Sequence, residues 1–133
     1  MPDNSPFRSS SDLIVKVLDN LGVLAVGQPV DPEDVAKVSK NLDSLIRKLG
    51  GLEIVYVSDR DNIPGEWFAD LADIIAGEVA TSFGLTGQPL ADMINKGLGG
   101  VGGIEIGAGT AAKSLKIMTR GKPTYERART EYF

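Results

Sequence analysis

The segment from Asp31 to Gly51 constrains the fold most, because it carries both the start signal and the apolar stripe of one long helix. It opens Asp-Pro-Glu-Asp, where a capping carboxylate, a first-turn proline and two further acids suit the exposed amides and positive end of a helix. Gly50 and Gly51 are predicted to end this helix. Its apolar residues recur at helical spacing and are Val35, Val38, Leu42, Leu45, Ile46 and Leu49.

One helix is predicted before this segment and another after it. Ser11 is expected to cap the first, and Gly22 is expected to close it. The stripe of the first helix comprises Ile14, Val17, Leu18 and Leu21. The later helix runs from Glu66 to Gly84, and its alanines and Gly77 would let a neighbouring helix approach closely.

Two shorter helices are predicted towards the C-terminus. One runs from near Pro89 towards Gly97, and the other spans about Thr110 to Thr119. The weak apolar face of the last helix comprises Leu115, Ile117 and Met118. Between the second and third helices, the β-branched stretch 53–57 is predicted to be either a strand or an extended connector.

Together these elements predict an all-α fold: a small bundle of about four to five helices with a glycine-rich loop and an extended C-terminal tail. The length of 133 residues is about one domain. The first two helices are expected to pack as an antiparallel hairpin. We divide the chain into a flexible N-terminal arm (1–10), a helical domain (11–119) with the glycine-rich loop at 97–109, and a tail (120–133).

The absent residue types restrict the chemistry. The sequence has no cysteine and no histidine, which excludes disulfides and thiolate zinc sites and removes the commonest general base. No cofactor and no metal site are expected. Asp70 and Asp73 share a predicted helix, but the spacing singles out no acid and base, and a solvated face is the favoured interpretation. An enzyme with a carboxylate site that cleaves cell-wall glycans is one hypothesis for the function.

Neither a secretory signal nor a membrane span is indicated. The opening MPDNSPFRSSSD lacks the apolar core of a signal. No stretch reaches the roughly 18–20 apolar residues of a transmembrane helix. A soluble, cytoplasmic protein without a membrane partner is therefore expected.

Residues 97–114 nearly contain two phosphate-binding motifs. Gly97, Gly99 and Gly102 fit G-x-G-x-x-G, and residues 107–114 miss a P-loop because Ala112 replaces its last glycine. A helix rather than a strand is predicted before this stretch, and too little chain follows it to build a parallel sheet. A nucleotide site is therefore disfavoured.

Three structural interpretations of this loop remain: a flexible surface loop, a glycine zipper and a loop ordered by partners. Seven of the thirteen residues 97–109 are glycine, and ordering costs about 1–2 kcal/mol per residue. Burying each of four apolar side chains returns at most about 1.5–3 kcal/mol. We expect neighbouring molecules to hold the loop through Leu98, Val101, Ile104 and Ile106.

The charge is distributed unevenly along the chain. Residues 113–133 carry six basic and two acidic side chains, whereas residues 1–112 carry eight basic and sixteen acidic ones. Tyr125, Tyr132 and Phe133 lie among the arginines of the tail. The tail could be a solvated disordered end, a nucleic-acid-binding arm or a docking peptide. The acidic body would repel DNA and weighs against the second of these.

The tail sequence RGKPTYERARTEYF (120–133) resembles the C-terminal signature of head-to-tail adaptors of short-tailed bacteriophages, the tail-accessory or packaged-DNA-stabilisation family. The stretch 11–23, SDLIVKVLDNLGV, is similar to the first helix of that family. The acidic start at 31–34, followed by LDSLI at 42–46, is similar to its second helix. The resemblance covers most of the chain loosely and the last fourteen residues more specifically.

The resemblance implies a structural virion protein that is not an enzyme. Such subunits form a ring under the portal protein, usually dodecameric, which extends the DNA channel and retains the packaged DNA. The ring is also the platform for the tail nozzle and tail fibre proteins. Genomic DNA would pass through without specific binding, and the protein would reside in the virion neck, or in the host cytoplasm during assembly.

The tail would then bind the portal or a neighbouring subunit. Its basic side chains would pair with carboxylates, and its aromatic ones would be apolar anchors. The predicted docking residues are Arg120, Lys122, Pro123, Tyr125, Arg127, Arg129, Tyr132 and Phe133. The alternative is a small DNA-binding or packaging regulator that uses the basic tail.

Overall fold

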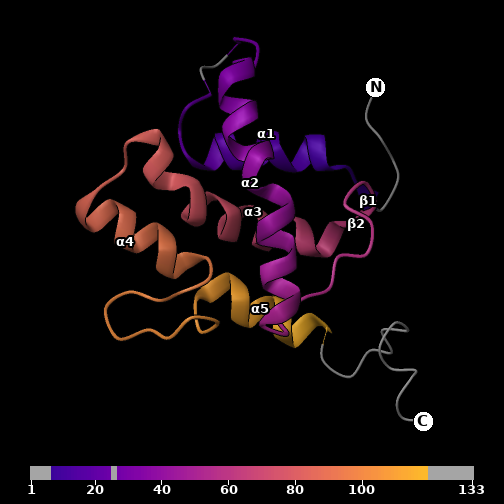
Figure 1. Ribbon diagram of the computed structural model, residues 1–133, viewed down its shortest axis with the longest axis vertical. Helices are drawn as coiled ribbons and strands as arrows, with labels where there is room; N and C mark the ends of the chain where they lie inside the picture. Colours follow the sequence, from indigo (N-terminus) through magenta and orange to yellow (C-terminus); the bar gives the residue numbers. More distant parts are fainter. Residues whose placement is uncertain (1–6, 25–26, 120–133) are drawn as a thin grey trace.

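The computed structural model describes residues 7–24 and 27–119, which are mostly helical (Figure 1). The elements in chain order are β1 (Phe7–Arg8), α1 (Ser10–Asn20), α2 (Pro32–Gly51), β2 (Ile63–Pro64), α3 (Gly65–Val79), the 3-10 helix η1 (Ala80–Phe83), α4 (Gly87–Lys96) and α5 (Thr110–Thr119). The predicted all-α class is confirmed, and the five α-helices of the described residues match the expected number. The predicted tail lies outside the described residues.

The first helix begins earlier than predicted. Ser9, not Ser11, is the N-cap: its hydroxyl accepts a hydrogen bond from the Asp12 amide at 3.2 Å, and the Asp12 carboxylate accepts one from the Ser9 amide at 3.3 Å. This reciprocal capping box requires an acid three residues after the cap, and among the neighbouring serines the structure pairs Ser9 with it. Ser10 is buried in the first turn.

The folded domain also begins earlier than predicted. β1 pairs antiparallel with β2, with Phe7 opposite Pro64 and Arg8 opposite Ile63. Residues 7–10 therefore belong to the folded domain, and assigning them to a flexible arm over 1–10 is wrong. The pairing partner lies more than fifty residues along the chain, so local sequence gave no signal for it.

Helix α2 starts and ends where predicted, but glycine does not provide the left-handed residue after it. The Asp31 carboxylate caps it by accepting from the Glu33 amide at 2.9 Å. The helix continues through Gly51, and Glu53 adopts the left-handed conformation (φ 59°) that usually falls to glycine. The amide of the next residue, Ile54, donates to Leu49 O at 3.0 Å, which closes the helix and turns Ile54 into the core.

Helices α1 and α2 do not form the predicted antiparallel hairpin. Figure 1 shows α2 crossing α1 steeply, whereas antiparallel helices would lie alongside each other in any view. Both helices also pack against α3. The two helices therefore share α3 as a packing partner.

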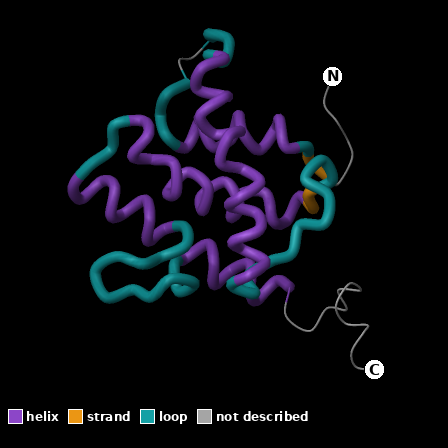
Figure 2. Tube along the Cα trace, viewed as in Figure 1, coloured by secondary structure: helices purple, strands orange, loops and turns teal. Residues whose placement is uncertain are grey.

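Helix α3 is the centre of the fold (Figure 2). It packs against α1, α2, α4 and α5, and almost every apolar side chain in its second half is buried. The α-helix ends at Val79, earlier than predicted; η1 continues from it, and Gly84 (φ 88°) closes η1. The buried set on α3 comprises Leu71, Ala72, Ile74, Ile75, Ala76, Gly77 and Val79.

Two glycines let helices approach one another closely. A Cβ on Gly77 would lie 3.0 Å from Met93 O of α4, which confirms the predicted close approach. A Cβ on Gly97 would lie 2.7 Å from Asp73 O of α3. The backbone of the C-terminal part of α4 is therefore held against α3.

Two further expectations are resolved by the structure. Residues 53–57 form an extended connector, not a strand, and bury Ile54 and Val55. Helix α5 has the predicted bounds, but Ile117 is 62% exposed and does not belong to its buried face. That face comprises Ala111, Ala112 and Leu115.

Candidate interaction surfaces

The glycine-rich stretch 97–109 forms a hydrogen-bonded loop between α4 and α5. The amides of Gly107 and Gly109 both donate to Leu98 O, at 2.8 and 3.1 Å. Within the loop, the Gly100 amide donates to Ile104 O at 2.8 Å. We expected that only neighbouring molecules would order this loop, and this expectation is wrong. Weighing the entropy cost of ordering against apolar burial alone omitted these internal hydrogen bonds.

Backbone geometry explains why the loop needs so much glycine. Gly99 has φ 92°, and a Cβ there would lie 2.5 Å from Glu105 O. A Cβ on Gly109 would lie 2.4 Å from Gly97 O. Residues 97–99 and 105–109 therefore pass so close to each other that no side chain fits between their backbones.

The four predicted loop contacts have different environments. Leu98 is 2% exposed and belongs to the core, so its prediction as a partner contact is wrong. Val101 is half-buried, and its amide donates to the Asn95 side chain at 3.3 Å. Ile104 and Ile106 are 39% and 57% exposed. Together with exposed Glu105, these two form what we call the loop tip (104–106).

An open groove of about 540 Å³ lies where α2 meets the following connector. Its apolar side chains are Ile46, Tyr56 and Val57, and Arg47 contributes the one charge. Tyr56 is half exposed, and its ring packs against Gly50, where a Cβ would lie 3.4 Å from Cδ1. We call this surface, with Gly50, Gly51 and Ser58, the α2 groove.

A second hollow, of about 520 Å³, lies along α1. Val15, 42% exposed, is on its wall with Leu24 and Phe68. The charged side chains around it carry both signs and comprise Arg8, Asp12, Lys16 and Asp19. These balanced charges give it no preference for a cationic or an anionic partner.

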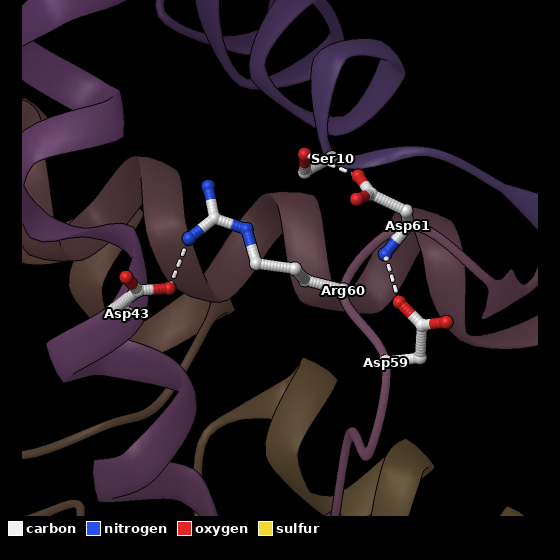
Figure 3. Close-up of polar contacts among 5 residues, drawn as sticks. All are labelled: Ser10, Asp43, Asp59, Arg60 and Asp61. Carbon is white, nitrogen blue, oxygen red and sulfur yellow. Dashed lines mark hydrogen bonds and ion pairs between the residues drawn. The ribbon is translucent and has the colours of Figure 1, made fainter.

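The polar cluster of Figure 3 fixes the 59–62 turn to the helices. Ser10 Oγ donates to Asp61 Oδ1 at 2.9 Å, and Arg60 pairs with Asp43 of α2. The Asp61 amide, 3.0 Å from Asp59 Oδ1, and the Asn62 side chain, 2.8 Å from its Oδ2, lower the Asp59 pKa. Each of these contacts is internal, and the cluster orients the connector that carries Tyr56.

Asp73 does not lie on the solvated helix face that the sequence favoured. Asn20 Nδ2 donates to its Oδ1 at 3.1 Å, and Lys96 Nζ lies 3.9 Å from the same oxygen. Burial raises the pKa of Asp73; Lys96 and Lys16 oppose this rise, and Asp70 adds to it. The carboxylate thus joins α1, α3 and α4.

The predicted docking residues 120–133 lie outside the described residues. Helix α5, which precedes them, ends at Thr119 and is anchored by Leu115. Sequence reasoning missed the α2 groove entirely. Its walls come from one edge of an amphipathic helix and from a connector, and the turn at Glu53 brings them together.

No group of three or more His, Cys, Asp or Glu side chains among residues 7–24 and 27–119 could hold a metal ion. No helix in the same ranges is long and apolar enough to cross a membrane. The chain matches no family model, and comparisons with curated proteins and with solved structures give no match.

Proposed function

We propose that this chain is a head-to-tail adaptor subunit of a short-tailed bacteriophage, which forms a ring under the portal protein. The ring extends the DNA channel, retains the packaged genome and is the platform for the tail. The resemblance of residues 120–133, together with the order of the helices before them, suggests this role. A small all-α body is compatible with it.

The observation that supports the proposal best is that the interaction features share one end of the molecule. The long axis is vertical in Figure 1, and the loop 97–109, helix α5 and the last turn of α2 all lie at its lower end. Residues 120–133 follow α5 in the sequence. The grouping of the loop, α5 and the last turn of α2 would make them available together for contacts with neighbouring proteins.

The charge distribution fits a DNA channel. Residues 1–112 carry twice as many acidic as basic side chains. In a ring, an acidic lumen would repel DNA and let it pass without adhering. The basic residues of the C-terminal segment would pair with carboxylates of the portal or of an adjacent subunit.

Binding of the full chain to the portal ring of the encoding phage tests the proposal. The double variant Tyr132→Ser, Phe133→Ser is expected to weaken binding at least ~100-fold, because aromatic anchors carry much of an interface. The variant Val15→Ser, which also removes exposed apolar surface, is the matched control. Electron micrographs of the mixture would show whether an added ring forms below the portal.

Equal portal binding by wild type and the double variant would contradict the docking role. DNA titration distinguishes the alternative regulator function. Tight binding of duplex DNA that weakens steeply with salt would favour that function, because each phosphate contact releases counterions.

A further inference from the structure

We propose that copies of this chain associate head to tail, with the loop tip (104–106) of one copy seated in the α2 groove of the next. The contact deepens the proposed function, on which the biological role of the resulting ring rests. The contact itself is argued from two described surfaces and can be tested without any other protein.

The loop tip has the properties of a binding element. Ile104 and Ile106 are both large, apolar and exposed. The hydrogen bonds from Gly100 to Ile104 O and from Gly107 to Leu98 O hold the loop in place. Such a loop loses little conformational entropy when it binds, so more of its burial energy is retained.

The α2 groove offers a surface of matching chemistry. Ile46, Tyr56 and Val57 make its walls apolar, and its volume of about 540 Å³ can receive two aliphatic side chains. The Tyr56 ring covers Gly50, whereas Gly51 is exposed and leaves its backbone open to a partner. An exposed tyrosine beside an apolar hollow is a frequent anchor in protein interfaces.

Charge complementarity selects the loop tip as the occupant. Arg47 is the one charged side chain lining the groove, and Glu105 lies between the two isoleucines of the tip. Neither has a side-chain hydrogen bond or ion pair within residues 7–24 and 27–119. Lys116 approaches the loop at Gly107 without pairing with Glu105. The tip thus presents Glu105 between two apolar side chains. The groove presents an apolar surface with Arg47, which has no ionic partner among the described residues.

The positions of the two surfaces make the contact heterologous. In Figure 1 the loop extends to one side of α5, away from the last turn of α2. One subunit can therefore offer its tip to one neighbour and its groove to another. Contacts of this kind close into a ring when the rotation between subunits allows, and otherwise form a filament.

Charge exchange tests the contact in the full chain. Glu105→Arg and Arg47→Glu should each raise the dissociation constant of self-association at least ~10-fold in sedimentation experiments, because each places like charges together. The double variant should regain wild-type association. Failure of the double variant to recover would overturn the proposal.

Mixing two variants tests the head-to-tail arrangement. A chain with a defective tip (Ile104→Ser, Ile106→Ser) and a chain with a defective groove (Arg47→Glu, Tyr56→Ser) should each remain monomeric. Their equimolar mixture keeps one intact tip and one intact groove, and should stop at a dimer of twice 14.1 kDa. Assembly of either variant alone to the wild-type size would contradict the arrangement.

Ile117→Ser is the matched control, since Ile117 is at least as exposed as either loop isoleucine but lies on α5 outside the tip. It should associate as wild type does. Circular dichroism of every variant checks that the helices are retained. A contact confined to one loop and one groove is small and therefore weak, so the series extends to roughly millimolar protein.

A wild-type chain that stays monomeric throughout that range would also overturn the proposal. The outcome is separable from that of the proposed function. Portal binding through residues 120–133 can be intact in the tip variant, and the tip can associate in the Tyr132→Ser, Phe133→Ser variant.

Discussion

Glu53 shows how a single residue can accept an unfavourable conformation so that its neighbours reach the core. Its φ of 59° lies in the left-handed region, where a side chain is strained. The next two residues, Ile54 and Val55, are each only 1% exposed. The burial of these neighbours stabilises the turn and offsets the strain.

Replacing Glu53 with glycine is therefore expected to stabilise the protein. Glycine relieves the strain of the left-handed conformation, but it also increases the entropy of the unfolded chain. The net effect should raise the free energy of unfolding by about 0.5–1 kcal/mol. The corresponding rise in Tm is roughly 2–5 °C by thermal melting. Leu52→Gly is the matched control and should destabilise, because Leu52 has φ −86° and no strain to relieve.

Asp73 is expected to make stability depend on pH. Its pKa is raised in the folded protein, so the folded state binds the proton more tightly than the unfolded chain does. The contribution of this group is thus most favourable below about pH 3.8 and declines as the pH rises through the raised pKa.

Asp73→Asn removes this titration and keeps an oxygen that can accept from Asn20. The variant's free energy of unfolding relative to wild type should therefore rise as the pH increases from 3.5 to 7. Urea titrations at several pH values measure this difference. A difference that does not change with pH would show that Asp73 does not titrate as described.

At the scale of elements, the glycine-rich loop shows that low side-chain content need not prevent order. Its backbone groups bond to one another and to Leu98, whose side chain is in the core. Five of its glycines have positive φ: Gly99, Gly100, Gly102, Gly103 and Gly107. The loop is thus a built element that positions its tip.

Two alanine substitutions separate strain from steric exclusion in this loop. Gly102→Ala should cost about 1–2 kcal/mol, because Gly102 has φ 64° but nothing within 4 Å of a Cβ. Gly99→Ala should cost a further ~1–3 kcal/mol, because its Cβ would clash with Glu105 O. Denaturant unfolding compares them, and equal costs would contradict the close backbone packing.

At the scale of the whole molecule, the described domain has a continuous core around α3. Side chains from all of α1, α2, α3 and α5 contribute to it, and so does Leu98 of the loop. The segment 120–133 follows the last of these elements. We therefore expect the fold to persist without the proposed docking segment.

Deletion of residues 120–133 is expected to leave a folded helical domain. The helical signal in far-ultraviolet circular dichroism should be retained. Tm should fall by no more than roughly 2–4 °C, which corresponds to a loss of about 1 kcal/mol or less in the free energy of unfolding. The deleted form should no longer join portal rings. A large loss of helix would show that the segment belongs to the core, and normal portal binding would contradict the docking role.

The sequence by itself determined the helices and the all-α class. Caps, helical periodicity and closing glycines act within a few residues, so Asp31, Gly84 and the bounds Thr110–Thr119 were predictable. Arg47 and Tyr56, by contrast, lie on opposite sides of a turn, and local patterns do not show that they line one groove.

Only the tertiary structure decided how the helices cross, that residues 7–8 pair with β2 and that the loop is ordered. These outcomes depend on partners distant in sequence, such as β2 for residues 7–8 and α3 for Gly97. Hydrogen bonds and backbone contacts between such segments form only when the chain is compact, and a periodic pattern in one segment carries no record of them.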